Sequence, residues 1–320
     1  MGRYVIRRIL QAIPLLFLLS IFMFGLIHLL PGGADAVLFN PRLTAAARAA
    51  LRVRMGLDDP VYIQYVKWLT NALTFNFGYS FNTNELVSTI LARRFPATLM
   101  LFVPALTIAF VVAVLLGVIS AVRQGTLTDY TLTVFAYFGI AMPVFLLGLL
   151  VQDIFGVWLQ WLPTSGTASL GVTLSPFASF LDQLQHLILP VLVLAIAFIA
   201  GWSRYMRSSM IETVKQDYMR TARAKGVGSV SLLFRHGLRN AVIPLITVVA
   251  LDFGAVVGGT VITEGIFAWP GIGLLFIDSL DRRDYPVLIA MLMIGAVLVI
   301  AFNLIADILY AVMDPRIRYS

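Results

Sequence analysis

Charged residues are scarce in this chain and cysteine is absent. Only 12% of its 320 residues are charged, whereas 60% are hydrophobic and the mean hydropathy is +0.91. Ordinary soluble domains carry roughly 25% charged residues, so this chain has too little charge to cover a soluble globule of its size, and its apolar content excludes disorder. Without cysteine it can form no disulfide, zinc–thiolate site or thiol nucleophile. The composition predicts an integral membrane protein.

Motifs of enzymes are missing as well. No GxxxxGK[ST] loop is present to cradle nucleotide phosphates, and neither GxSxG nor HExxH occurs. The histidines, His28, His186 and His236, fall in separate segments without metal-site spacing. We therefore expect no catalytic residue, metal or cofactor in this chain. Its net charge of +7 is typical of membrane proteins with basic cytoplasmic loops, so no nucleic acid partner is expected.

Six apolar segments are long enough to cross a bilayer, which takes about 20 helical residues. The first is too long for the apolar region of a signal peptide, so it is interpreted as a retained helix. We predict an all-α polytopic fold, in contact with membrane lipid, in which residues 1–320 form a single transmembrane domain. The predicted spans are 9–30, 97–121, 131–158, 184–202, 241–263 and 287–312.

Lys and Arg are distributed unevenly between the loops on the two sides. If the N-terminal tail is cytoplasmic, the same side receives the 203–240 loop with its eight basic residues and the C-terminal tail with Arg316 and Arg318. The opposite loop 159–183 has no Lys or Arg. Because Lys and Arg concentrate in cytoplasmic loops, we expect six crossings with the N and C termini in the cytoplasm.

The long loop 31–96 carries helix signals, so we expect it to be structured and extracytoplasmic. Thr44 is placed to cap a first short helix, and Asp59-Pro60 supplies a cap and a first-turn proline for a second. An apolar stripe predicts a third helix over 85–94 that ends before the next proline. Their apolar faces are expected to pack on the ends of the membrane helices.

Two sets of residues within the predicted spans call for an explanation. Carboxylates are costly in a bilayer, so Asp252, the deepest one, is a candidate for the translocation path. A hydrogen bond to a neighbouring helix or subunit is the simpler interpretation and is favoured. Asp153 and Asp307 lie nearer to helix ends. Close helix packing, inside the chain or with a second subunit, is predicted by Gly254, Gly258 and Gly259.

The loop 203–240 has more local order than a tether needs. Asp217 is placed to cap a short helix that Gly226 would end, and a second helix over 229–236 leads back to the membrane. Small side chains leave one side of the first helix low enough to enter a groove, and basic side chains flank it, able to reach acidic groups on a partner. The basic side chains of this helix are Arg220, Arg223 and Lys225. Taken alone, such a loop is more often a solvated or headgroup-facing surface.

A longer sequence pattern favours a partner-binding helix over a solvated surface. The run TAxxxG at 221–226, followed by RNAVIP at 239–244, resembles the EAA loop of permease subunits of binding-protein-dependent ABC importers. DYMRTARAKG at 217–226 is similar to the form in dipeptide, oligopeptide and nickel importers, although Arg220 replaces the namesake glutamate and Asp252 stands where glutamine is expected. Other matches, in the expected order, are MGLDDPVYIQY (55–65), FGYS (77–80), RFPATL (94–99), WPGIG (269–273), RDYPV (283–287) and DPRIR (314–318).

The resemblance implies the type I ABC importer permease fold and the B-type subunit of an importer for peptides or related small solutes. Its implied partners are a second homologous permease, two cytoplasmic ATPase subunits that hold ATP and Mg²⁺, and an extracytoplasmic substrate-binding protein, at the cytoplasmic membrane of a bacterium or archaeon. The implied ATPase-coupling helix comprises Asp217, Tyr218, Arg220, Thr221, Ala222, Arg223, Lys225 and Gly226. A second cytoplasmic contact comprises Arg235, Arg239 and Asn240.

The last outer loop places charge beside a rigid turn. We expect this loop to dock the binding protein or to form a gate; a solvated loop tip is an equally good interpretation. The candidate residues are Glu264, Trp269, Pro270, Gly271, Asp281 and Asp284.

Two other classes remain as alternatives. A secondary, ion-coupled transporter would favour inverted repeats with broken helices, but the membrane prolines fall in no paired pattern. An intramembrane enzyme would need a nucleophile clustered with a base, which the sequence does not suggest. Co-purification with an ATPase would separate the importer from both.

Overall fold

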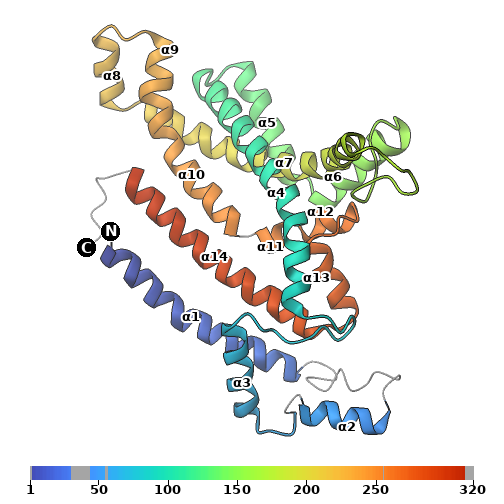
Figure 1. Ribbon diagram of the computed structural model, residues 1–320. Helices are drawn as coiled ribbons and strands as arrows, with labels where there is room; N and C mark the ends of the chain where they lie inside the picture. The colour runs from blue at the N-terminus through green and yellow to red at the C-terminus, as the bar shows by residue number, and fades with distance from the viewer. Residues whose placement is uncertain (1, 30–43, 55–56, 255, 314–320) are drawn as a thin grey trace.

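The described part of the chain folds mainly into helices (Figure 1). The computed structural model describes residues 2–29, 44–54, 57–254 and 256–313, and no β-strand occurs among them. In chain order the helices are α1 (Gly2–Leu29), α2 (Ala45–Arg54), α3 (Val61–Leu73), α4 (Val87–Val122), α5 (Leu127–Ala141), α6 (Val144–Val151), α7 (Pro176–Val214), α8 (Asp217–Ala224), α9 (Ser229–Ser231), α10 (Arg239–Gly254), α11 (Val256–Gly259), α12 (Val261–Ile266), α13 (Ile272–Asp281) and α14 (Tyr285–Met313), with π-helical segments η2 (Gln152–Trp158) and η3 (Leu232–Leu238).

Within these described residues, five straight helices are long and apolar enough to span a bilayer, and a sixth span exists if one bent pair is counted as a unit. The bent pair is α5 with α6–η2, which meet at 101°. The bend follows from Pro143, because a proline disfavours the helical conformation of the preceding residue, and Met142 is extended at φ −76° and ψ 118°. The predicted third span, 131–158, is therefore a broken one.

The fifth predicted span, 241–263, begins earlier than expected. The helix runs without a break from Ser229 through η3 to Gly254, so the short cytoplasmic helix expected over 229–236 is the start of the membrane helix. On the other side of residue 255, which lies outside the described residues, the chain is again helical in α11 and α12.

The outer loop is helical, as expected, but its third helix is not separate. α2 and α3 form as predicted, whereas the 85–94 stripe belongs to α4, which runs through Pro96 for 36 residues. An interior proline costs about 3 kcal/mol. Burial of Val87 and Leu91 against Val287 and its neighbours outweighs it, because each buried aliphatic side chain contributes about 1.5–3 kcal/mol.

α4 and α7 form the central pair of the molecule, and their facing side chains make the main core. α7 has 39 residues, which at about 1.5 Å each exceeds the roughly 30 Å hydrocarbon thickness. Its last turns, 203–214, were expected to be loop. They stay helical because Met206 and Met210 continue the buried face.

The first and last helices lie side by side in Figure 1. Arg8, near the start of α1, pairs with Asp307, near the end of α14, at 3.0 Å. At its other end, α1 holds α3 through the hydroxyls of Ser20 and Tyr65, 2.8 Å apart, and through Phe24. α10 packs against the inner side of α14, so α14 lies between α10 and α1.

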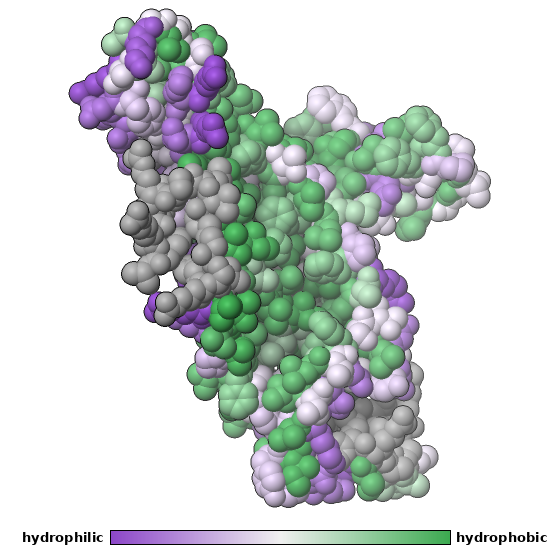
Figure 2. Space-filling view, turned by 60° about the vertical axis from the view of Figure 1, so that its left-hand side comes forward, coloured by the Kyte–Doolittle hydropathy of each residue, from purple (hydrophilic) through white to green (hydrophobic). Residues whose placement is uncertain are grey.

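Polar and apolar surfaces are segregated in the space-filling view. Figure 2 shows a broad apolar surface between polar residues over α8 and α9 at the top and further polar residues at the bottom. Many large apolar side chains of the membrane helices are exposed, including Leu18, Phe135 and Phe138. So much exposed apolar area requires contact with lipid or with partner helices.

Candidate functional site

The predicted coupling helix is α8, at the tip of the molecule beyond the end of α7 (Figure 1). It ends as expected: Gly226 has φ +82°, its N–H donates to the Arg223 carbonyl at 3.0 Å, and the Val227 N–H donates to the Ala222 carbonyl at 3.3 Å. These two bonds make a Schellman motif, which a glycine favours.

The start of α8 differs from the prediction. Gln216 occupies the N-cap and Asp217 is the first helical residue, without a capping hydrogen bond. A carboxylate in the first turn is still favoured by the helix dipole. Asp217 instead faces Arg220 at 3.6 Å, an exposed pair that contributes little.

The inner face of α8 is fastened to η3. Met219 is 2% exposed, and Gly237 lies opposite it in the π-helix. A Cβ atom on Gly237 would lie 2.9 Å from Cε of Met210 and 3.4 Å from Cε of Met219, so the ends of both methionine side chains pack directly on this glycine. The sequence analysis did not identify this contact, because nothing local marks residues 219 and 237 as neighbours.

A hydrogen bond joins the two parts of the predicted cytoplasmic motif. The Asn240 amide donates to the Tyr218 hydroxyl at 3.2 Å and to the His236 carbonyl at 3.0 Å. Together α8 with its closing turn 225–228, α9, η3, Arg239 and Asn240 form one unit, called here the cytoplasmic module after the side of the membrane that the sequence predicts for it.

The outer face of the cytoplasmic module is basic. Tyr218 and Thr221 are exposed, whereas Ala222 is half-buried on the Met219 side, so the low face expected at Ala222 points partly inward. Within the described residues none of the module's other arginines and lysines pairs with a carboxylate. They are Arg223, Lys225, Arg235 and Arg239, all exposed.

An ion pair that the sequence analysis missed joins α4, α5 and α7 near the cytoplasmic module. Asp129 is buried and receives Nε and Nη2 of Arg207, both at 2.8 Å. The Ser120 hydroxyl and the Gly125 amide also donate to it. A two-pronged contact with further donors is the arrangement in which a buried charge pair is stable.

The membrane carboxylate Asp252 has a partner on a neighbouring helix. Its Oδ2 accepts the indole N–H of Trp202 at 2.7 Å, which joins α10 to α7. This is the hydrogen bond that the simpler interpretation predicted.

The glycines after Asp252 differ from one another. Gly254 packs on α14, with Cα of Val299 3.0 Å from the position of a Cβ atom, so its neighbour lies within the chain. Gly258 is exposed and has nothing within 4 Å inside this chain, so close packing there stays a prediction for a second subunit. The surroundings of Gly259 lie outside the described residues.

Glu264 is not an exposed docking charge, because it is fully buried beneath the turn at 269–271. Its carboxylate accepts the Thr98 hydroxyl at 2.7 Å and the Leu274 amide at 3.0 Å. A side chain at Gly271 would overlap this carboxylate. Burial raises the pKa of Glu264 above its ordinary value, opposed by these donors.

The turn itself is also packed rather than exposed. Trp269 is fully buried and its indole N–H donates to the Ala97 carbonyl at 2.8 Å. Arg94 donates to the Pro270 carbonyl at 3.1 Å. With Glu264 and Gly271 these contacts hold α12 and α13 against α4, an arrangement called here the outer clamp.

Asp284 is a second buried carboxylate on the same side. It accepts the Ser80 hydroxyl, the Phe81 amide at 3.0 Å and the Asn82 side chain at 3.2 Å, and so ties the 80–82 turn to the start of α14. Exposure was wrongly predicted for Asp284 and Glu264, because local sequence does not show which donors surround a carboxylate. Asp281 is exposed, as expected.

Comparisons with known proteins cover the whole chain. Residues 113–319 match the family model described as binding-protein-dependent transport system inner membrane component, and residues 1–102 match the model of its N-terminal part. The oligopeptide transport system permease protein AppB of Bacillus subtilis is 43% identical over 320 residues, and the glutathione transport system permease protein GsiC of Escherichia coli K12 is 39% identical over 320 residues; both alignments cover 100% of both chains. A putative peptide permease protein of Brucella suis is 44% identical over 326 residues, again across 100% of each chain.

Proposed function

We propose that this chain is a permease subunit of an ATP-driven importer for peptides or related small solutes. The chain belongs to the family of binding-protein-dependent transport system inner membrane components. It is a multi-pass protein of the cytoplasmic membrane. The relatives offer nothing for the ion-coupled alternative. The chain would form half of the translocation path, and a second homologous permease would form the other half.

The observation that carries this proposal is the cytoplasmic module. Its exposed basic face, from Arg223 to Arg239, would contact a groove on an ATPase subunit, where acidic groups or helix C-termini supply the complementary charge. ATP and Mg²⁺ would be held by the ATPase subunits, and an extracytoplasmic binding protein would deliver the solute.

The contacts inside the chain supply a route for motion. Displacement of α8 would be transmitted to η3 through the contact between Met219 and Gly237. η3 continues without a break into α10. α10 contacts α14 at Gly254 and α7 at Asp252, so displacement of α8 would tilt these helices together. Rigid-body motion of packed helices is a known means of alternating access.

The test is ATPase association, measured on the complex of this chain with its partner subunits. Thr221→Glu places a carboxylate on the exposed face of α8, where it would be desolvated unpaired in an interface. We expect normal membrane insertion but loss of ATPase co-purification and of binding-protein-stimulated ATP hydrolysis. Gln124→Glu adds the same charge to the exposed α4–α5 turn and is the control. Normal coupling in Thr221→Glu would refute the assignment of α8.

The proposed orientation, with both termini in the cytoplasm, has a direct test. The chain has no cysteine, so single cysteines can be introduced without background. Thr173, Asp281 and Ser229 are all exposed. An impermeant thiol reagent should label Thr173→Cys and Asp281→Cys from outside, and Ser229→Cys only after the membrane is opened. The reverse pattern would refute the orientation.

A further inference from the structure

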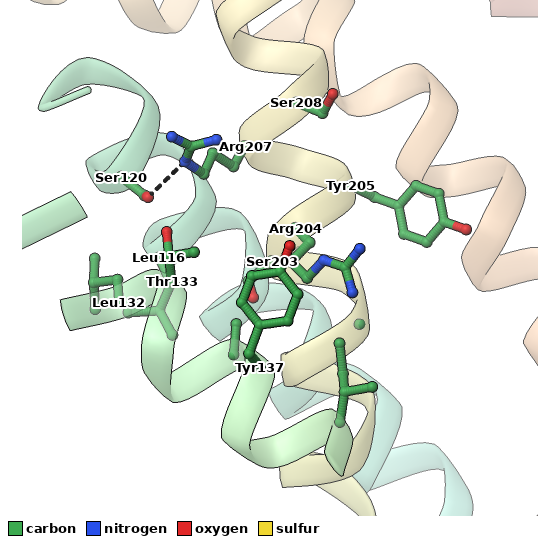
Figure 3. Close-up of a pocket in the computed structure, with 13 residues that line it drawn as sticks. Leu116, Ser120, Leu132, Thr133, Tyr137, Ser203, Arg204, Tyr205, Arg207 and Ser208 are labelled. Atoms are coloured by element: carbon green, nitrogen blue, oxygen red, sulfur yellow. Dashed lines mark hydrogen bonds between the residues drawn. The ribbon is translucent and has the colours of Figure 1, made fainter. Parts of the chain in front are cut away.

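A cavity of about 590 Å³ lies between the cytoplasmic ends of α4, α5 and α7 (Figure 3). One part of its wall is apolar, formed by Leu116, Leu132 and Ile140. Another part carries Arg204 and Arg207 on α7, with Tyr137 on α5. None of these residues belongs to the cytoplasmic module or to the outer clamp.

The two arginines differ in what neutralises them. Arg207 gives its Nε and Nη2 to Asp129, so this pair carries no net charge. Arg204 pairs with no carboxylate among the described residues; its guanidinium carbon lies 4.8 Å from the centroid of the Tyr137 ring. Figure 3 shows Tyr137 and Arg204 together on one side of the cavity and Arg207 beside Ser120 on the other. The cavity therefore keeps one uncompensated, exposed guanidinium.

The position of this charge relative to the membrane matters. Arg204 follows directly on the predicted span 184–202, and Asp129 lies in the first turn of α5. Next to the cavity, α5 exposes the large apolar side chains of Val134 and Phe138. A cationic, aromatic end and an apolar wall opening onto such a surface match the two parts of a phospholipid.

We propose that this cavity binds an anionic phospholipid from the cytoplasmic leaflet, with its phosphate at Arg204 and an acyl chain along Leu132 and Ile140. The inference rests on the proposed orientation, because that leaflet carries the anionic lipids and basic pockets between membrane helices bind their headgroups. Arg207 is a positioning residue here: its bond with Asp129 joins α7 to α5 beside the cavity. The Tyr137 ring keeps the Arg204 guanidinium at the mouth of the cavity.

The experiment measures retained lipid on the permease complex by native mass spectrometry, after exchange into nanodiscs of phosphatidylglycerol or of phosphatidylcholine. We expect the wild-type complex to retain phosphatidylglycerol in preference to phosphatidylcholine. Arg204→Gln should lower that retention about fivefold, the effect of removing one cation near an anionic lipid. Arg204→Lys should keep most of it, because the charge remains.

The control is Arg123→Gln, which removes an exposed arginine from the α4–α5 turn on the same side. It should retain lipid as the wild type does. Equal loss in Arg123→Gln, or equal retention of the two lipids by the wild type, would show that no headgroup site exists.

Three further outcomes would overturn the proposal. Displacement by inorganic phosphate alone would indicate a free anion site, and displacement by a transported peptide would place the cavity in the translocation path. Loss of the lipid on assembly with the second permease would show that a partner helix covers the cavity. ATPase co-purification, measured on the same samples, reports independently on the proposed importer function.

Discussion

The cytoplasmic module and the outer clamp are both made of short helices, yet they treat charge in opposite ways. The module exposes unpaired cations such as Arg223 and Arg239, whereas the clamp buries Glu264 and surrounds it with donors. Polar groups whose hydrogen bonds are satisfied within a chain contribute stability, and charges left exposed are available to a partner. We therefore expect changes in the clamp to act mainly on stability and changes in the module to act mainly on coupling.

The largest effect on stability is expected from Glu264→Ala. It leaves the Thr98 hydroxyl and the Leu274 amide buried without an acceptor, at about 1–3 kcal/mol for each group. Thermal unfolding of the purified protein should show a clear loss of stability, with a smaller one in Glu264→Gln, which keeps an acceptor. An unchanged melting temperature in Glu264→Ala would mean that the clamp does not stabilise the fold.

Glu264 also makes stability depend on pH. Its folded pKa is raised by burial above the ordinary value of 4.5, so the protonated form is favoured in the folded state. The stabilisation is complete below the unfolded pKa and is lost as pH rises through the folded pKa. The melting temperature of the wild type relative to Glu264→Gln should therefore fall as pH rises from about 4.5. A rising difference would contradict the sign of the shift.

The next largest effect on stability is expected at the buried Asp284, and the exposed Asp281 on the same side of the molecule is its comparison. Asp284→Ala removes the acceptor of Ser80 and Phe81 and should destabilise the protein by about 1–3 kcal/mol. Asp281→Ala, on the exposed end of α13, should leave the melting temperature unchanged. If Asp281 docks the binding protein, Asp281→Lys should weaken stimulated ATP hydrolysis more at low salt, where exposed charges are less screened.

A smaller stability effect is expected in the module. Gly226→Val forces a β-branched residue into a left-handed conformation, which costs about 1–2 kcal/mol. The strain is confined to an exposed turn, so we expect the protein to stay folded. The C-terminal end of α8 should be distorted, and ATPase co-purification should fall. Gly171→Val, at another exposed turn with positive φ, is the control and should keep coupling.

The smallest effect is expected from Asp217→Asn. Asp217 is 96% exposed at its side chain and pairs loosely with Arg220, so its loss should change stability by less than about 0.5 kcal/mol. A larger change in the melting curve would mean that Asp217 caps α8 after all.

Features that depend on neighbours in sequence were predictable. Gly226 marks the end of α8 because a helix needs a left-handed residue to finish in this way. α2 and α3 were likewise readable from their local signals. The apolar runs located the spans, since a bilayer demands a fixed length of apolar helix whatever packs beside it.

Features that depend on distant segments were not predictable. Pro96 lies inside a helix because residues near 287 bury the turn before it. Glu264 is buried because Thr98, far away in the sequence, donates to it. Similarly, Asp129 and Arg207 meet only because α5 folds back on α7. In each case a long-range contact outweighs the local preference, and one sequence by itself does not display that contact.

The pairing of α1 with α14 bears on how the protein is made. α1 is synthesised before α14, so the ion pair between Arg8 and Asp307 can form only after α14 has been made. During that time the face of α1 that will contact α14 is covered by lipid or by the insertion machinery. The last helix therefore closes the bundle, and until it is in place α1 is held within the described chain mainly by its contact with α3.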